Sequence, residues 1–196
     1  MQSKFVRHTG LVLVLAVLCA CATVPRETGQ VMKGELDPRE YRYLELPNRM
    51  RVMLVSDPAS DKAAASVQVR TGSGDDPEGR QGLAHFLEHM LFLGTGKYPD
   101  PAEYQAFINA HGGSHNAYTS VDHTNYFFDV EPGSLVPALD RFAQFFVAPL
   151  FNREYVEREM NAVDSEYKMG LKDDSRREYD VLRELVQPGH PLAKLA

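Results

Sequence analysis

The sequence predicts an α+β fold. Segments that are rich in β-branched and aromatic residues, or that alternate apolar and polar residues, predict strands, and segments with apolar residues three or four positions apart predict helices. Both kinds of segment occur in a chain of 196 residues, of which 43% are hydrophobic and 24% charged. Such a chain can form one well-packed domain and hardly two.

The first predicted elements are strands. Residues 41–46 and 51–56 are expected to form a hairpin around the turn Pro47-Asn48-Arg49, and residues 64–71 a third strand. A loop that contains Gly72 and Gly74 then leads to a helix over residues 82–92.

The middle of the chain continues with a helix and a strand pair. A helix is predicted over residues 101–111, with Pro101 in its first turn and Gly112-Gly113 at its end. Two strands follow, 114–120 and 124–130, in which Thr, Tyr, Phe and Val predominate.

The last third of the chain is predicted to be helical. The helix over 135–146 carries an apolar stripe that is expected to face the core, formed by Leu135, Leu139, Phe142 and Phe146. Asn152 is expected to cap the next helix. Its core-facing stripe is predicted to consist of Val156, Met160, Val163 and Tyr167. A final helix is predicted over 173–185.

The N-terminus has the features of a signal peptide. Lys4 and Arg7 precede an apolar run over residues 11–20, which is too short to span a bilayer, so residues 1–20 are predicted to be removed. Leu18-Cys19-Ala20-Cys21 resembles the lipobox of bacterial lipoproteins, which makes Cys21 the expected lipidation site. An ordinary secretory signal that is cleaved nearby is the alternative. The lipobox predicts an exported protein of the bacterial cell envelope, anchored in the outer membrane and facing the periplasm.

Both cysteines of the chain lie in this leader region, so the rest of the chain has no disulfide and no cysteine metal ligand. Residues 21–39 are expected to form a tether between the lipid bilayer and a domain over residues 40–196 that looks cut short at its C-terminal end. The net charge of −6 and the scattered Lys and Arg residues give no nucleic-acid-binding footprint.

The helix over 82–92 carries the pattern of a metal site. His85, Glu88 and His89 fall within one arc of roughly 100°. Leu83, Phe86, Leu87, Met90 and Leu91 occupy the opposite arc. Two histidines four residues apart can bind one ion, and a carboxylate between them can hold a water molecule at that ion. This H-x-x-E-H order is the inverzincin pattern. A polar helix face with two solvated histidines is the alternative.

Two acidic residues on a later helix share one face. Glu159 and Glu166 are seven residues apart, which places them roughly 10 Å from each other along the helix axis. Taken alone, such a pair is typical of a solvated helix flank.

From about residue 41 onward, the sequence resembles the inverzincin zinc metallopeptidases of the pitrilysin and insulin-degrading enzyme (insulinase) family. The resemblance rests on residues 82–90, Gly-Leu-Ala-His-Phe-Leu-Glu-His-Met, on residues 111–120, His-Gly-Gly-Ser-His-Asn-Ala-Tyr-Thr-Ser, on residues 123–130 and on residues 161–166, Asn-Ala-Val-Asp-Ser-Glu. It implies an α+β domain whose mostly antiparallel sheet is covered by helices, in agreement with the predicted elements.

The resemblance also implies roles for individual residues. His85, His89 and Glu166 would bind Zn²⁺, Glu88 would act as general base, and Glu159 would support the site. A peptide substrate would add as a strand at Asn116, Ala117 and Tyr118. Phe92 would either line a substrate pocket or simply pack in the core, and the same two possibilities hold for Tyr118. His111, His115 and His123 are not expected to be ligands.

The function that the resemblance implies is zinc-dependent endoproteolysis of peptides or unfolded polypeptides. The alternative is a noncatalytic zinc-bearing domain that binds peptides, or one subunit of a two-chain peptidase. Members of the family are several times longer, so missing C-terminal domains or a partner subunit are expected to complete the substrate site.

Overall fold

The computed structural model describes residues 26–27, 29, 31–187 and 189–190 of the chain. The predicted signal peptide over 1–20 and Cys21 lie outside this part. Within the described part, no helix combines the length and the apolar character that a bilayer-spanning helix needs. The chain divides into two compact units, Met1–Ala59 and Ser60–Ala196, so the predicted domain over 40–196 contains residues of both.

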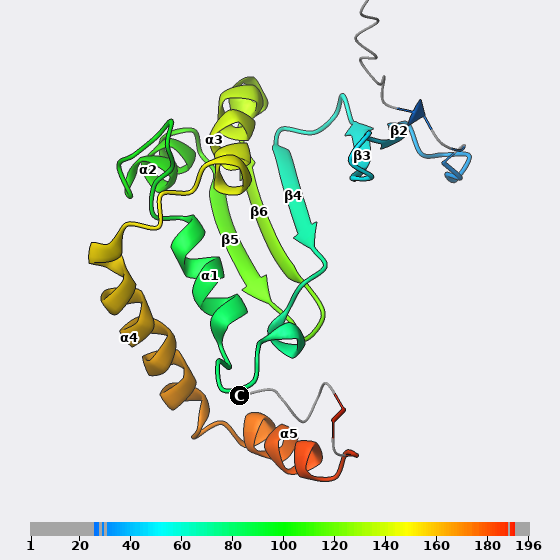
Figure 1. The fold of residues 1–196 in the computed structure, drawn as a ribbon. Coiled ribbons are helices and arrows are strands. Elements are labelled where there is room, and N and C mark those ends of the chain that lie inside the picture. Colours follow the sequence, from blue (N-terminus) through cyan, green and yellow to red (C-terminus); the bar gives the residue numbers. More distant parts are fainter. Residues whose placement is uncertain (1–25, 28, 30, 188, 191–196) are drawn as a thin grey trace, which may run out of the picture. The chain divides into compact units, whose positions relative to one another are not determined.

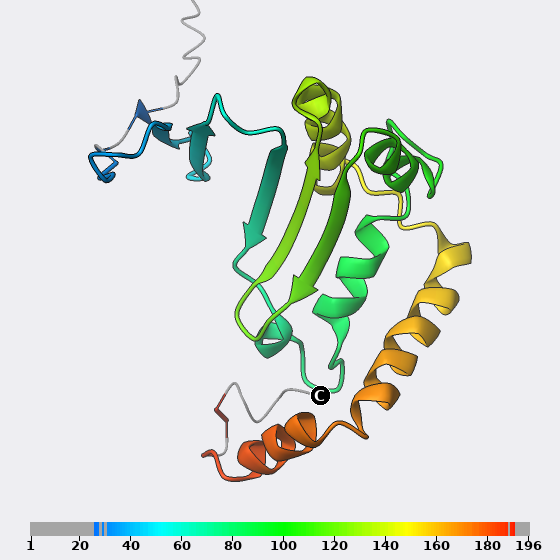
Figure 2. The same ribbon diagram turned by 180° about the vertical axis from the view of Figure 1, so that it is seen from behind.

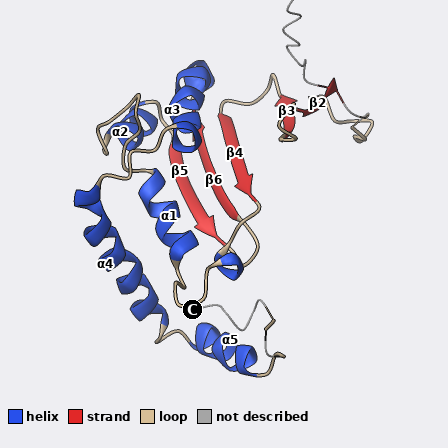
Figure 3. Cartoon of the chain, in the orientation of Figure 1, coloured by secondary structure: helices blue, strands red, loops and turns tan. Residues whose placement is uncertain are grey.

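The described part of the first unit is an antiparallel sheet with the strand order β1-β2-β3 (Figure 3). Its strands are β1 (Arg26–Glu27), β2 (Glu40–Glu45) and β3 (Arg51–Ser56). Strands β2 and β3 pair along their whole lengths, which confirms the predicted hairpin. Strand β1 belongs to the segment that is expected to form a tether. A strand of two residues shows no sequence periodicity, so pattern analysis could not find it.

The second unit contains another antiparallel sheet, with the order β4-β6-β5 (Figure 1). Its strands are β4 (Ala63–Val69), β5 (Ser114–Thr119) and β6 (Thr124–Val130). The antiparallel pairing agrees with the predicted fold class. Among the described strands, β5 has a neighbour on one side only and is therefore an edge strand.

Three helices cover one face of this second sheet: α1 (Leu83–Leu91), α2 (Glu103–Ala110) and α3 (Leu135–Val147). Short 3₁₀ helices, Ser73–Asp75 and Pro132–Ser134, precede α1 and α3. Alternation along β6 directs Tyr126, Phe128 and Val130 toward the helices, where they form the core with residues of all three. The helical members of this core are Leu91, Tyr104, Ile108, Ala138, Phe142 and Phe145.

Two further helices complete the second unit, α4 (Arg153–Gly170) and α5 (Asp174–Glu184). Figures 1 and 2 show α4 running alongside α1, on the side away from β5. Helix α1 therefore lies between the sheet edge and α4. Asp173 caps α5 by accepting hydrogen bonds from the backbone N–H groups of Ser175 and Arg176.

The predicted elements are present, but the rotation of several helices about their axes differs from the prediction. In α4, Met160 and Tyr167 were expected in the core and are 57% and 47% exposed. The side of α4 that faces α1 instead carries Glu159, whose side chain is only 13% exposed. Val156 and Val163 of the predicted stripe are partly buried, so the prediction was wrong for Met160 and Tyr167, because α4 packs against a polar face of α1.

Similar corrections apply to the other helices of this unit. In α3 the buried positions include Ala138 and Phe145, whereas Leu139 and Phe146 of the predicted stripe are exposed. In α1, Leu83 and Leu87 of the apolar arc are also exposed. Periodicity locates an apolar stripe only to within about one residue position, and the neighbouring elements decide which of its members become buried.

Candidate metal centre

The start of the metal-binding helix is fixed by an aspartate that pattern analysis did not select. The carboxylate of Asp76 accepts hydrogen bonds from the backbone N–H groups of Gly82 and Ala84, at 2.7 and 2.9 Å. These groups lie at the N-terminus of α1, where backbone donors lack partners within the helix. Gly82 has a φ of 87°, a left-handed conformation that favours glycine. Asp76 is buried, so this cap is shielded from water.

The two histidines of α1 direct ring nitrogens at one point. His85 Nε2 and His89 Nε2 are 3.2 Å apart, and the two rings are nearly perpendicular. In a tetrahedral zinc site with Zn–N distances of roughly 2.0–2.1 Å, two ligand atoms lie roughly 3.3 Å apart. The spacing of the two nitrogens therefore fits one zinc ion between them.

Glu166 of α4 brings a carboxylate to the same point. Its Oε2 lies 3.4 Å from His85 Nε2, and its Oε1 lies 3.8 Å from His89 Nε2. Within the described part of the chain, His85, His89 and Glu166 form the group of side chains that could hold a metal ion. Two imidazole nitrogens and one carboxylate are a donor set typical of catalytic zinc, which keeps a fourth position for water or substrate. The residues present thus fit Zn²⁺.

Glu159 contacts the ring nitrogen of His89 that faces away from the metal position. Its Oε2 is 3.2 Å from His89 Nδ1, and its Oε1 accepts a hydrogen bond of 2.8 Å from Arg158 Nε. A proton on Nδ1 that is donated to Glu159 leaves the lone pair of Nε2 free to face the metal. The position of Glu159 next to His89 is the one that the supporting role implied by the sequence resemblance requires.

Glu88 lies deeper than its position in the helical arc suggested. It is only 7% exposed, and the hydroxyl of Thr119 donates a hydrogen bond of 2.6 Å to its Oε2. Tyr126 lies close to Glu88. The pKa of the Tyr126 phenol is raised by burial and, to a smaller extent, by the negative charge of Glu88. Sequence reasoning did not select Thr119, because a threonine at the end of a strand needs no functional explanation.

The predicted substrate residues Asn116, Ala117 and Tyr118 lie on the edge strand β5, and Asn116 and Tyr118 are exposed. Their contact with a peptide stays a prediction. Phe92 follows α1 and packs among aromatic rings, including those of Tyr104 and Phe145. These contacts support a packing role for Phe92.

Three further histidines, His111, His115 and His123, lie outside the metal cluster, as expected. His111 Nδ1 donates to the carbonyl of Phe107, and His123 Nδ1 pairs with Asp122. His115 packs against aromatic rings, and burial lowers its pKa.

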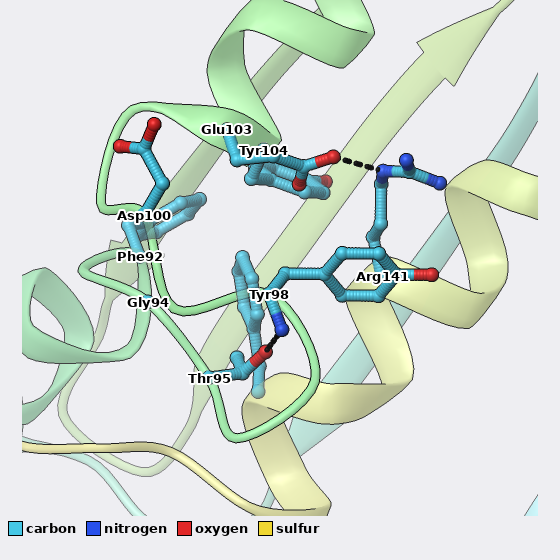
Figure 4. A pocket seen from close by; sticks show the side chains of 9 residues that line it. Phe92, Gly94, Thr95, Tyr98, Asp100, Glu103, Tyr104 and Arg141 are labelled. Carbon is cyan, nitrogen blue, oxygen red and sulfur yellow. Dashed lines mark hydrogen bonds and ion pairs between the residues drawn. The ribbon is translucent and has the colours of Figure 1, made fainter.

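A small cavity lies beyond Phe92 and away from the metal cluster (Figure 4). Its volume of about 10 Å³ is close to the space that one water molecule needs. Figure 4 shows Glu103 joined to Arg141, whose Nε donates a hydrogen bond of 2.7 Å to the Glu103 carboxylate. The cavity has no room for a peptide.

A mixed fold with antiparallel sheets and a helix-borne His-His-Glu cluster are the features expected of the class of zinc metallopeptidases. The family model described as Insulinase (Peptidase family M16) matches residues 51–189. The chain belongs to this insulinase family of peptidases.

Similar proteins agree with the family. The chain is 51% identical over 164 residues to the insulin-degrading enzyme of Bos taurus, and 48% identical over 165 residues to the A-factor-processing enzyme of Saccharomyces cerevisiae. Each alignment covers 84% of this chain and 16% of the relative. Two further relatives carry the words zinc protease in their names.

The crystal structure of pitrilysin has the same fold, with a TM-score of 0.81 and 40% sequence identity. The match covers 87% of this chain and 18% of that one. The chain thus spans less than a fifth of the length of each of these relatives.

Proposed function

We propose that the protein is a zinc-dependent endopeptidase that hydrolyses peptides or unfolded polypeptides. The observation that carries the proposal is the convergence of three ligand side chains from two helices, with the acidic residue Glu88 on the same helix as the two histidines. The spacing of the ligand atoms fits catalytic zinc, and family membership supports a peptidase.

In this proposal, each side chain of the site has a separate role in hydrolysis. Bound at this cluster, Zn²⁺ would polarise the substrate carbonyl and lower the pKa of water. Glu88 takes a proton from the attacking water and returns it to the leaving amine. Glu159 holds His89 in the tautomer and orientation that leave Nε2 free. The substrate backbone pairs with the open edge of β5, near Asn116, Ala117 and Tyr118.

We also propose that Cys21 is lipidated and anchors the protein in the bacterial cell envelope, in the outer membrane and facing the periplasm. The sequence Leu18-Cys19-Ala20-Cys21 after an apolar run supports this. Because the chain spans so little of its relatives, further C-terminal domains or a partner subunit would complete the substrate site.

The test of the hydrolytic function compares two substitutions in the full-length protein. Glu88→Gln keeps the shape of the side chain but removes the base, so peptide hydrolysis should fall by roughly 10²- to 10⁴-fold while zinc and peptide still bind. His85→Ala removes a ligand, so zinc content and activity should fall together. Zinc content, peptide affinity and cleavage of a fluorogenic peptide are measured for each protein.

Glu157→Gln serves as the matched control, because it makes the same change at an exposed position of α4. It should behave as the parent in all three assays. If Glu88→Gln hydrolysed peptides at the parental rate with zinc bound, the peptidase mechanism would be refuted. The noncatalytic peptide-binding or partner-subunit function would then take its place.

A further inference from the structure

We propose that Thr119 is the residue that positions the catalytic base Glu88. This inference rests on the proposed peptidase function. It starts from one contact, in which the Thr119 hydroxyl donates a hydrogen bond of 2.6 Å to Glu88 Oε2. That distance is within the range of hydrogen bonds between a hydroxyl and a carboxylate.

The fold holds Thr119 firmly in this place. It is the last residue of β5 and lies directly opposite Thr124 of β6. The hairpin closes just beyond it, where Ser120 N–H donates to the carbonyl of His123 at 2.8 Å. A β-branched side chain in a strand has restricted χ1 freedom, so the direction of the hydroxyl is set by the backbone.

The hydrogen of the Thr119 hydroxyl is committed to Glu88. The hydroxyl of Thr124 is 3.5 Å from that of Thr119, which is longer than a good hydroxyl hydrogen bond. Thr124 donates its own hydrogen to the carbonyl of Thr71 at 2.9 Å. The two neighbouring threonines therefore have separate partners, and Thr119 is the one that contacts Glu88.

This hydrogen bond restricts rotation of the Glu88 carboxylate about the last side-chain torsion. The last torsion of a glutamate side chain is broad, so the carboxylate of Glu88 can rotate unless a partner fixes it. Thr119 holds Oε2, so Oε1 is the oxygen left to take the proton from water. Because Glu88 is buried, a neutral donor also compensates part of the cost of its charge.

Thr119 also faces the strand edge where the substrate is expected. In an antiparallel pair, directly opposed residues alternate between hydrogen-bonded and non-hydrogen-bonded positions. The bond between Ser120 and His123 makes theirs a hydrogen-bonded pair, so the backbone groups of Ala117 and Thr119 point away from β6. One residue thus offers its backbone to the peptide and its hydroxyl to the base, which fixes the two relative to each other.

The test uses Thr119→Val, which keeps the shape and removes the hydroxyl, and Thr119→Ser, which restores the hydroxyl. In the zinc-loaded full-length protein, Thr119→Val should lower kcat roughly 10- to 100-fold, the scale of one hydrogen bond to a charged group, with KM nearly unchanged. Thr119→Ser should recover most of the lost rate. Thr124→Val makes the same change at the residue directly opposite Thr119 in the hairpin and should keep the parental kcat. Thr119→Ala replaces the valine variant if that variant does not fold.

Zinc content and crystal structures of the zinc-loaded variants provide readouts that are independent of activity. Thr119→Val should keep its zinc, because Glu88 is not a ligand, while the Glu88 carboxylate should rotate or occupy several orientations. An unchanged carboxylate in that variant would overturn the inference whether or not the protein is a peptidase.

The kinetic outcomes separate the inference from the proposed function. Parental kcat in Thr119→Val, together with an inactive Glu88→Gln, would overturn the positioning role and leave the peptidase function intact. An equal loss in Thr124→Val would show a general loosening of the hairpin and would also overturn it. Parental activity in Glu88→Gln would refute the peptidase mechanism itself.

Discussion

Three glutamates surround the two histidines, and their neighbours give each a different role. Glu88 is buried and is held by the hydroxyl of Thr119. Glu159 lies between Arg158 and His89 Nδ1. Glu166 is 46% exposed and approaches the Nε2 atoms of both histidines. In the proposed mechanism, these different contacts suit the three glutamates to the roles of base, orienting group and ligand.

His115 gives the folded protein a pH dependence that is separate from catalysis. Its ring packs against Phe92 and Tyr104, with centroids 5.4 and 5.1 Å away. Burial lowers its pKa below the ordinary value of 6.5, so the unfolded chain binds this proton more readily than the folded protein does. The stabilising contribution is therefore fully present above pH 6.5 and is lost as the pH falls from 6.5 toward the lower pKa of the folded state.

We expect His115→Phe to reduce the loss of stability on acidification. Denaturant unfolding of parent and variant between pH 7.5 and 5 measures the difference in slope, which for one proton is at most about 1.4 kcal/mol per pH unit. Working with metal-free protein removes the contribution of zinc release. Parallel curves for the two proteins would show that His115 is protonated equally easily in the folded and unfolded states.

At the scale of elements, α1 is the part on which the site depends, because it carries His85, Glu88 and His89. Asp76→Ala removes both hydrogen bonds that hold its first turn and an acidic group from its N-terminus. The free energy of unfolding should fall by about 1–2 kcal/mol, and zinc should bind more weakly. Thermal unfolding and zinc titration measure the two effects.

Asp75→Ala is the matched control for this prediction. The Asp75 carboxylate accepts a hydrogen bond from Gly72 N–H, at the 3₁₀ helix that precedes α1. Its removal should cost stability but leave zinc affinity close to that of the parent. Equal losses of zinc affinity in both variants would mean that the loop as a whole, and not the cap of α1, controls the site.

The sequence was sufficient for the longer helices and strands, though not for β1, and for half of the site. His85 and His89 are local, so their helical spacing was visible without a fold. Glu166 is 77 residues beyond His89, and only the family resemblance related the two. Thr119 was missed because it acts through a tertiary contact, and Asp76 because its hydrogen bonds cross an irregular loop; neither residue occurs in a distinctive local pattern.

The errors in α4 have the same origin. Helical periodicity ranked Met160 and Tyr167 as core residues because they are apolar. In the structure, α4 turns its acidic flank toward α1, where a metal-binding cluster takes the place of apolar packing. Binary patterning assumes that buried faces are apolar, and a functional site is where that assumption fails.

At the scale of the whole molecule, we expect Cys21 alone to determine whether the protein is attached to a membrane. Cys21→Ala should prevent lipidation, so that the protein is recovered in the soluble fraction after cell fractionation. Cys19→Ala, which removes the neighbouring cysteine, should leave it in the membrane fraction. Retention of the Cys21→Ala protein in membranes would point to an uncleaved N-terminal anchor.

Because the metal ligands come from α1 and α4, a bound ion would link these two helices reversibly. Joining His89 to Glu166 closes a ring of chain that includes α2, β5, β6 and α3, and the entropy cost of closing such a ring grows only slowly with its length. The two histidines of α1 stay neighbours in any state in which that helix is formed, whereas Glu166 arrives only when α4 docks. Met160, Tyr167 and Met169 of α4 are exposed, so zinc bound to Glu166 would add to the packing that holds α4 against α1, and zinc binding would be coupled to the docking of this helix.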